Sequence, residues 1–380
     1  MLPLRTRLRL ELGETDAPVR FLVELQDSRA FWDTQKLFLS PAHINEVDFL
    51  QAQVQFNSDN FIGQGLASRF TIGRFTMDLG KRRLVARNGM RNTTNAFDGV
   101  LWTLGRVSEW KIRTFVTSPV NIKSKELDSS DPRRYFWGAY YEYLRFQKFR
   151  TELYYLGIHE DDDIAFRKRQ STLGMRIFKN PSPAAMNFEV ESAWQFGKTG
   201  EQNHFSHLQH GELGYSLGSM WNPRLSFQYD YAEGDADPED NKFGRFTGLF
   251  GARSFEYTPT GIYGPVFRSN LNSPGIRVVI NPLKQLEIMA SHRAFWLARA
   301  KDAWVGSLLV DPTGNSGKTL GQNFEIKVLW RPRDFFVMDF GYSRFFKGSY
   351  QDRVPGSPGT RDSNYFYIAT EINAQLLPFR

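Results

Sequence analysis

Apolar and polar residues alternate with a period of two through most of this chain. In segment 4–12 one side carries mainly leucine, and the other carries Arg5, Arg7, Arg9 and Glu11. Segments 187–196, 223–232 and 320–330 follow the same rule. Successive side chains of a β-strand point to opposite faces, so this pattern predicts strands with one oily and one polar face.

The pattern predicts strands that are mostly close to the roughly 9–11 residues a tilted transmembrane strand needs. The predicted strands are 4–12, 19–27, 47–56, 66–75, 94–104, 109–118, 134–144, 149–158, 168–178, 187–196, 207–218, 223–232, 273–281, 285–296, 320–331, 334–345 and 363–376. The sequence has no stretch near the roughly 18–20 consecutive apolar residues of a membrane-spanning helix. A helical membrane protein is therefore excluded.

The connections between these strands alternate between short and long. The short ones are 13–18, 57–65, 105–108, 145–148, 180–185, 222–223, 281–284 and 331–333, and the long ones are 28–46, 76–93, 119–133, 159–167, 197–206, 233–272, 297–319 and 346–362. Outer-membrane barrels have short periplasmic turns and long extracellular loops. We therefore expect an all-β fold, a transmembrane antiparallel up-and-down β-barrel that occupies 1–380 as one domain.

The alternation also predicts the direction of the strands. A short turn follows the first strand, so that strand runs inward from the outside, and the last strand ends in the periplasm. Bacterial single-chain barrels normally have an even number of strands. We expect the intact protein of the bacterial outer membrane to have about eighteen strands, with the first strand and a signal peptide missing from this chain.

The amino-acid composition limits the kinds of molecule that this protein is expected to contact. Aromatic residues make up 15% of the chain, which suits the girdles of a lipid-facing barrel. The net charge is +7, and the basic residues are spread along the chain rather than gathered on one helix or module. This distribution favours a basic-lined cavity for an acidic solute over nucleic acid. The lipid bilayer and lipopolysaccharide are the expected surroundings.

The segment 66–104 carries a recognisable set of residues, namely Gly73, Arg74, Arg83, Leu84, Asn92, Thr93, Phe97, Asp98 and Gly99. In these residues it resembles the alginate export family of outer-membrane barrels, and 22–29, 263–271 and 320–332 are similar to further segments of that family. The resemblance implies an eighteen-stranded barrel whose arginines and lysines attract a uronate polymer. It places Arg5 and Arg268 on two of those basic positions and allows a periplasmic export partner.

The candidate residues for selecting solutes in the lumen are Arg5, Arg7, Arg9, Arg74, Arg113 and Arg268. A cluster of unpaired arginines would concentrate anions and exclude cations. Strand 4–12 is the best candidate, because three arginines at alternate positions cannot all find acidic neighbours locally. The alternative is that such charges pair in ladders that brace the wall. The aromatic 233–272 connection is expected either to fold partly into the lumen or to lie on the outer surface.

Other motifs carry little chemistry. The segment 311–319 imitates a phosphate-binding loop but has Pro312 where glycine is needed, so we interpret it as an ordinary loop. His204, His207 and His210 are three residues apart, which sends neighbours to opposite faces of a strand. The acidic segment 159–163 is interpreted as a solvated loop, with calcium binding as the alternative. We expect no cofactor, metal or catalytic site.

Four functions remain as hypotheses. The first is passive export of an anionic, alginate-like polysaccharide through a basic-lined lumen. The second is a porin for small acidic solutes, and the third is a hydrolase acting at the barrel rim. The fourth, a soluble basic β-protein, is disfavoured because oily outer faces would make it aggregate. The chain is not expected to be an enzyme.

Overall fold

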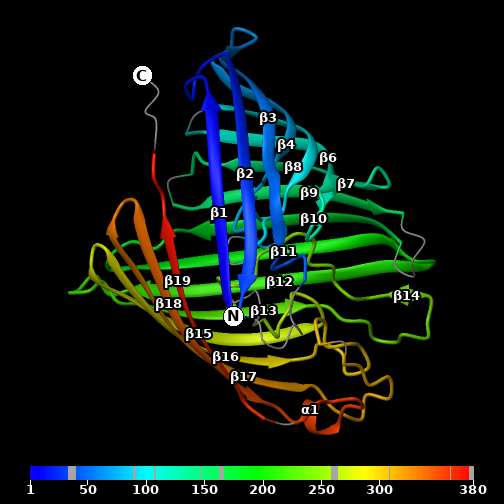
Figure 1. The fold of residues 1–380 in the computed structure, drawn as a ribbon. Helices are drawn as coiled ribbons and strands as arrows, with labels where there is room; N and C mark the ends of the chain where they lie inside the picture. Colours follow the sequence, from blue (N-terminus) through cyan, green and yellow to red (C-terminus); the bar gives the residue numbers. More distant parts are fainter. Residues whose placement is uncertain are drawn as a thin grey trace.

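The chain forms one large antiparallel sheet with almost no helix (Figure 1). The computed structural model describes residues 1–32, 40–88, 91–106, 108–146, 148–161, 167–257, 264–307, 309–359 and 361–375. Within these ranges no helix is long and apolar enough to cross a membrane.

The elements follow each other around the wall in chain order. They are β1 (Leu2–Leu12), β2 (Val19–Phe31), β3 (Asn45–Phe61), β4 (Leu66–Phe75), β5 (Phe97–Arg106), β6 (Trp110–Asn121), β7 (Ser129–Ser130), β8 (Arg134–Tyr143), β9 (Arg150–Glu160), β10 (Lys168–Lys179), β11 (Ala185–Thr199), β12 (Gln202–Ser216), β13 (Arg224–Ala232), β14 (Lys242–Phe243), β15 (Leu271–Leu283), β16 (Leu286–Trp296), β17 (Thr319–Arg333), β18 (Phe336–Lys347), α1 (Tyr350–Arg353) and β19 (Ser363–Ile372). Two of the nineteen strands, β7 and β14, have two residues each, so seventeen long strands form the wall.

All seventeen predicted strands are present, and each long strand pairs antiparallel with the next. The long loop predicted at 197–206 is wrong. There β11 and β12 continue as strands, with Lys198 opposite Asn203 and Thr199 opposite Gln202, and only 200–201 forms the turn. The alternation of apolar and polar residues ends before these strands do, because a strand segment beyond the hydrocarbon layer needs no apolar face.

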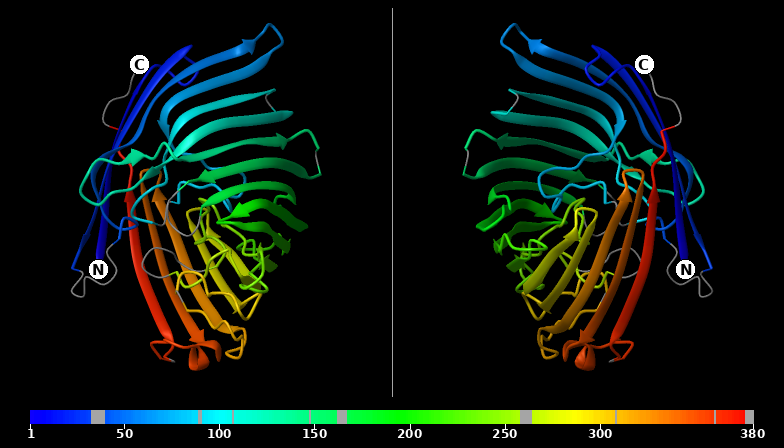
Figure 2. Two further views of the ribbon diagram at one scale, coloured as in Figure 1. Left: turned by 90° about the vertical axis from the view of Figure 1, so that its right-hand side faces the viewer. Right: turned by 90° about the vertical axis from the view of Figure 1, so that its left-hand side faces the viewer.

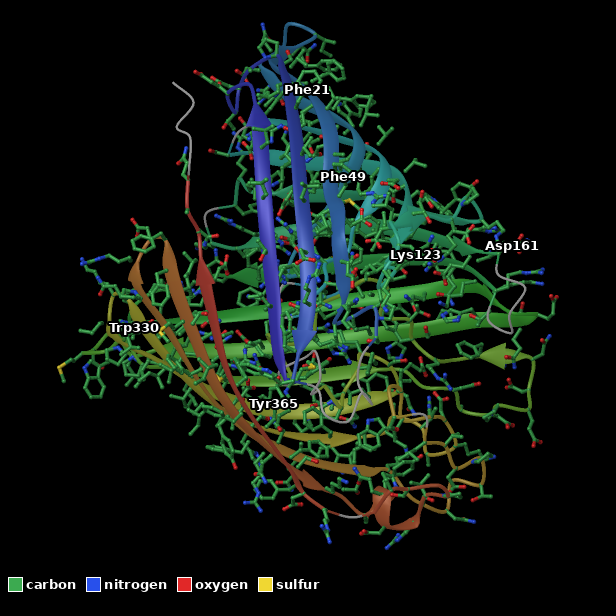
Figure 3. The ribbon with its side chains drawn as sticks, in the orientation of Figure 1. Phe21, Phe49, Lys123, Asp161, Trp330 and Tyr365 are labelled. Atoms are coloured by element: carbon green, nitrogen blue, oxygen red, sulfur yellow. The ribbon has the colours of Figure 1, made fainter. Side chains whose placement is uncertain are left out.

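The two faces of the wall have opposite chemistry. On β13, Leu225, Phe227 and Tyr229 are 48%, 57% and 40% exposed, whereas Ser226, Gln228 and Asp230 are buried. The apolar side chains point outward, as do the exposed Phe21 and Phe49 (Figure 3). The polar side chains point into the barrel, around which the strands curve (Figure 2). This orientation is the one expected for a barrel in lipid.

Two connections fold inside the barrel and meet there. They are the 76–96 loop, between β4 and β5, and the 233–270 loop, between β13 and β15. Phe250 N–H donates to the Leu84 carbonyl at 2.9 Å, and Ala86 N–H donates to the Phe250 carbonyl at 3.1 Å. Of the two expected placements of the second loop, insertion into the lumen is therefore confirmed for its described part 244–257, whereas 237–243 lies at the outer end of β12.

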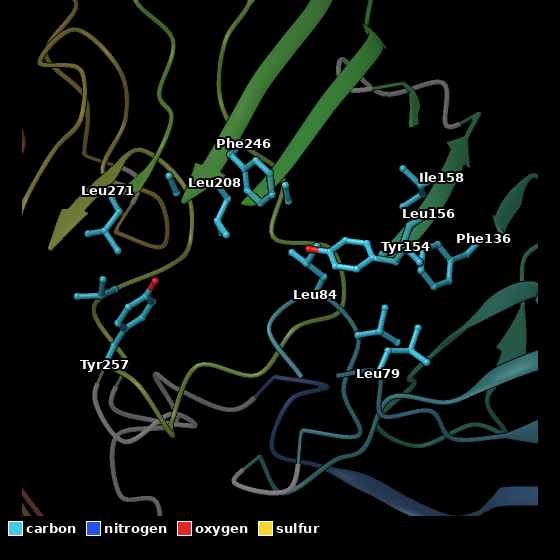
Figure 4. Close-up of a cluster of buried hydrophobic side chains, with 14 of the residues drawn as sticks. Leu79, Leu84, Phe136, Tyr154, Leu156, Ile158, Leu208, Phe246, Tyr257 and Leu271 are labelled. Atoms are coloured by element: carbon cyan, nitrogen blue, oxygen red, sulfur yellow. The ribbon is translucent and has the colours of Figure 1, made fainter. Parts of the chain in front are cut away.

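The inner wall opposite these loops is apolar, which the expectation of a polar inner face did not foresee. Phe115 on β6, Phe136 on β8 and Leu156 on β9 are at most 3% exposed and point inward. They join Leu84 in a buried cluster that also takes in Tyr154 (Figure 4). The polar-inside rule fails here because these strands face packed protein rather than water.

The wall has two free edges. The described residues form no ladder between β1 and β19, which lie at neighbouring edges of the wall in Figures 1 and 2. Seventeen strands joined by antiparallel pairs give the first and last strands the same direction. An antiparallel closure between them therefore requires a further strand in the gap.

We predict that Phe250→Ala loosens the 233–270 loop while the wall stays intact. The Phe250 ring contacts Phe97 and Phe136, with centroids 5.1 and 4.9 Å apart. Losing a packed phenylalanine costs about 3 kcal/mol. Faster protease cleavage within this loop, at unchanged thermal unfolding of the barrel, is the expected result. Phe335→Ala removes an exposed ring and serves as the control; equal cleavage of both variants would contradict the prediction.

Candidate functional site

One arginine contacts both the wall and the second inserted loop. Arg83, on the 76–96 loop, is 2% exposed. Its guanidinium lies 2.5 Å from Glu191 on β11 and 2.5 Å from Glu256 on the 233–270 loop, and it also contacts Glu189 on β11. One cation thus joins both loops to the wall, and we call this group of residues the Arg83 clamp.

Two of the three glutamates of the clamp are each neutralised by more than one cationic side chain. Burial alone would raise the pKa of Glu256, but Arg83, Arg268 and His210 hold it well below its usual range. Arg268 bonds the Glu256 carboxylate and the Ala252 carbonyl. Further along the wall, Arg176 bonds Glu189 at 2.9 Å. Such a network keeps its charges only while every partner is in place.

One group of side chains in this network has the donor set of a metal site. His210, Asp230 and Glu256 offer ligand atoms within 4.8 Å of one another. Arg293 already bonds Asp230 at 2.6 and 2.7 Å, and Arg83 and Arg268 neutralise Glu256. A metal ion would have to displace these guanidinium groups, so the arrangement fits a structural ion network better than a metal site.

Three predicted lumen residues bond acidic side chains. Arg74 binds Asp98 through two nitrogens at 2.8 and 3.0 Å. Arg113 lies 3.2 Å from Glu142, and Arg268 belongs to the clamp network. These arginines therefore agree with the alternative expectation, in which the charges pair with each other and brace the barrel wall. Their role in selecting solutes stays a prediction.

The three arginines of β1 are partnered as well. Arg9 pairs with Glu11 on the same strand, and Arg7 bonds Gln26 at 2.9 Å with Glu24 3.7 Å away. Arg5 donates to the Arg91 carbonyl at 2.8 Å. The expected cluster of unpaired arginines on this strand is therefore wrong, because Glu11, the neighbouring strand and the Arg91 carbonyl supply partners. The role of these arginines in selecting solutes stays a prediction.

Two arginines that the sequence did not single out have no acidic partner among the described residues. Arg91 is largely buried, which lowers its pKa, and its Nε has no hydrogen-bond partner. Arg253 stacks on Phe267 at 3.5 Å and donates to the Val266 carbonyl at 3.0 Å. Burial, followed by Arg268 and Arg91, lowers the pKa of Arg253 to about 10. Both residues lie on inserted loops, where period-two alternation gives no signal.

A cavity of about 240 Å³ opens beside Arg91. Its wall includes Asn95, Asn121, Arg134 and the Phe250 ring. Arg134 is bonded to Glu160 at 3.1 Å, so Arg91 supplies the uncompensated charge. The lining combines apolar side chains with a desolvated guanidinium and amide groups. Such a cavity suits a small, partly apolar molecule that carries a carboxylate.

The remaining motifs are explained by local structure. Asp311 accepts hydrogen bonds from Thr313 N–H at 3.0 Å and Ser316 N–H at 2.7 Å, so 311–319 is a loop that leads into β17. The three histidines all lie on β12, with His204 and His210 buried inward and His207 on the other face. Of the acidic segment, His159 and Glu160 end β9, whereas residues 162 and 163 lie outside the described residues.

Comparison with solved structures gives the same barrel architecture. OpdK from Pseudomonas aeruginosa, solved with vanillate, is similar with a TM-score of 0.63 at 11% identity over 97% of this chain and 92% of that chain. OccD3 (OpdP) of the same organism gives 0.60 at 12% identity, over 97% and 85%. OccK8 (OprE) gives 0.54 at 11% identity, over 97% and 96%. A comparison with curated proteins finds no match.

The two-faced wall and the fold it shares with these solved structures define an outer-membrane β-barrel. The alginate export family model matches residues 3–361. The chain therefore belongs to the alginate export family, as its resemblance in 66–104 implied.

We predict that Arg83→Met opens the interior of the barrel. Removing one partner of a buried ion pair typically costs about 3–5 kcal/mol, and here it leaves three carboxylates facing one another. Single-channel recordings should show larger and noisier currents. The control is Lys81→Met, because Lys81 is an exposed cation two residues away on the same loop. Identical currents in both variants would refute the clamp.

The clamp should also hold in mild acid. The folded pKa of Glu256 lies below its unfolded value, so its contribution to stability is complete above the unfolded pKa and is lost only as pH falls through the folded value. Wild-type conductance and protease resistance of the 233–270 loop should therefore stay constant between about pH 7 and pH 5. A transition in that interval would show that Glu256 is not held ionised.

Proposed function

We propose that this protein is a passive outer-membrane channel for solutes that carry a carboxylate, and that small acidic sugars fit it best. The observation that carries the proposal is the pair of acid-free arginines, Arg91 and Arg253, on the loops that meet inside the barrel. A solute that crosses the lumen has to pass these loops. A desolvated guanidinium recognises a carboxylate strongly and with defined geometry.

The proposed transport step follows from electrostatics. Arg91 and Arg253 lie close enough for Arg91 to lower the pKa of Arg253, so each carries charge that nothing described nearby neutralises. An entering carboxylate relieves this repulsion and is held for a time. Conduction requires binding that is favourable but weak enough for release. The partnered arginines of the wall, such as Arg7 and Arg74, offer weaker attraction because their charges are already partly compensated.

The size of the solute is inferred from the loop junction. Ala252 N–H donates to the Arg82 carbonyl at 2.9 Å, which adds to the bonds between Phe250 and the 76–96 loop. With the Arg83 clamp, this junction divides the lumen. A small acid needs only a side passage, whereas a polymer strand needs the junction to open.

Export of an anionic polysaccharide is the second candidate, and the match to the alginate export family favours it. The small-solute reading has support from OpdK, which was crystallised with vanillate, itself a carboxylate. The family and the structural neighbours are channels rather than enzymes. A rim hydrolase therefore has no observation in its favour.

Planar-bilayer recording separates these candidates. We predict anion-selective conductance that glucuronate reduces at millimolar concentration, with a polyuronate added to either side having little further effect. Block by polyuronate at much lower concentration would favour export. Conductance without any preference for anions would contradict both the small-solute channel and the polysaccharide exporter.

The double substitution Arg91→Gln with Arg253→Gln should lower anion selectivity about fivefold or more, since one charge at about 4 Å is worth ~1 kcal/mol even in water. The matched control is Arg106→Gln, which removes an exposed charge at the end of β5 near the short turns. Unchanged selectivity in the double variant, with the barrel correctly folded, would show that these two arginines do not select the solute.

A further inference from the structure

A row of cationic side chains crosses the outer surface of the wall above its oily band. Arg169 on β10 and Lys198 on β11 stand directly opposite each other in the ladder, and both are exposed. One strand further, Lys198 stands opposite Asn203 on β12, which pairs with the exposed Lys242 of β14. The residues of a ladder pair point to the same face, so the row lies on one surface.

That surface is the lipid-facing one. On β10 the exposed residues below Arg169 on the same face include Leu173, and on β11 those below Lys198 are Phe196 and Trp194. Phe205 on β12 stands opposite Phe196 and is 59% exposed. The charges lie two residues beyond these rings, about 7 Å along a strand. That distance reaches from the hydrocarbon core into the headgroup layer.

The row is at the extracellular end of the barrel. It lies beside the 161–167 connection and the 200–201 turn, at the end where the 233–270 loop also begins. Asp161, at the end of β9, marks this end in Figure 3. The opposite end carries the short turns, such as 13–18 and 62–65. In outer-membrane barrels the short turns are periplasmic.

Arg169 and Lys198 have no acidic partner among the described residues, in contrast to three other arginines at this rim. Arg29 pairs with Asp27 at 2.9 Å, and Arg344 pairs with Asp362 at 3.1 Å. Even Arg167, the neighbour of the row, pairs with Asp161 at 2.9 Å. The two unpaired cations therefore offer their full charge to a partner outside the chain.

A cavity of about 110 Å³ lies beside these two cations. It is lined by Arg167, Arg169, Lys198, Gly200 and Glu201. The Gly200 N–H donates to the Arg167 carbonyl at 2.7 Å, which fixes the turn beside it. Among the residues that line this cavity, Arg169 and Lys198 are unpaired cations, Arg167 is paired with Asp161, and Glu201 is the one carboxylate. The cations outnumber the carboxylate, so the cavity suits a phosphoryl group, which accepts several charge-assisted hydrogen bonds.

We propose that Arg169 and Lys198 form a binding site for the phosphoryl groups of lipopolysaccharide in the outer leaflet, with Lys242 extending it toward β14. The acyl chains of the same lipid then lie against Leu173, Trp194 and Phe205. Among phosphorylated ligands, a lipid is favoured over free phosphate because the charges stand directly above an oily surface. The site is separate from the lumen and does not depend on which solute the channel carries.

The test compares binding of bisphosphorylated lipid A to purified, detergent-solubilised protein. The variant is Arg169→Gln with Lys198→Gln. The matched control is Arg29→Gln with Arg133→Gln, which also removes two cations from the rim, but ones that pair with Asp27 and Asp131. Heat-dependent gel migration confirms that each barrel is folded, and dephosphorylated lipid A and inorganic phosphate are the comparison ligands.

Wild type and control should bind bisphosphorylated lipid A equally, and the Arg169/Lys198 variant about tenfold or more weakly, which corresponds to ~1.4 kcal/mol. Dephosphorylated lipid A should bind all three proteins alike. Equal binding of bisphosphorylated lipid by the variant and wild type would overturn the proposal. So would competition by inorganic phosphate at the concentration of the lipid, since the site would then recognise free phosphate. Conductance of the variant should match wild type, so this test stands apart from that of the channel function.

Discussion

The requirement that every backbone polar group in the oily layer find a partner determines this structure. No water is present there to bond an exposed N–H or C=O, so the chain can cross only as a continuous hydrogen-bonded ladder. That ladder sends alternate side chains outward into lipid and inward. The seventeen long strands and the exposed leucines and phenylalanines are consequences of this one constraint. The inward faces are left free to vary, and they carry the features that distinguish this barrel.

Inside the wall, the interactions are those of a compact globular protein. Phe136 and Leu156 pack on the 76–96 loop, and Arg83 joins both inserted loops to β11. The clamp is buried and shared among three carboxylates, so it fixes the position of the loops rather than adding much net stability. It thereby sets where Arg91 and Arg253 stand.

The sequence predicted the wall well and the interior poorly, for a physical reason. Period-two alternation reports that the two faces of a strand meet different media, and every strand that crosses lipid meets this condition. It says nothing about loops, so neither the Arg83 clamp nor Arg91 was foreseen. It also failed at Phe136, where both faces of the strand meet apolar surroundings, and at 198–203, where the strands extend beyond the hydrocarbon layer. The arginines of β1 were judged unpaired because alternation along one strand does not show which groups of the next strand and of the inserted loop lie beside them.

The cations that we propose to select the solute, Arg91 and Arg253, belong to the two loops and not to the wall, and this has an evolutionary consequence. A change of cargo can arise by replacing residues near 91 and 253 while all lipid-facing and ladder positions stay as they are. The joint between Arg83, Glu189 and Glu191 would have to be inherited together, because a loop without its anchor would no longer sit at a defined height in the tube. Related barrels can thus diversify by changing the two inserted loops while the wall of the barrel stays the same.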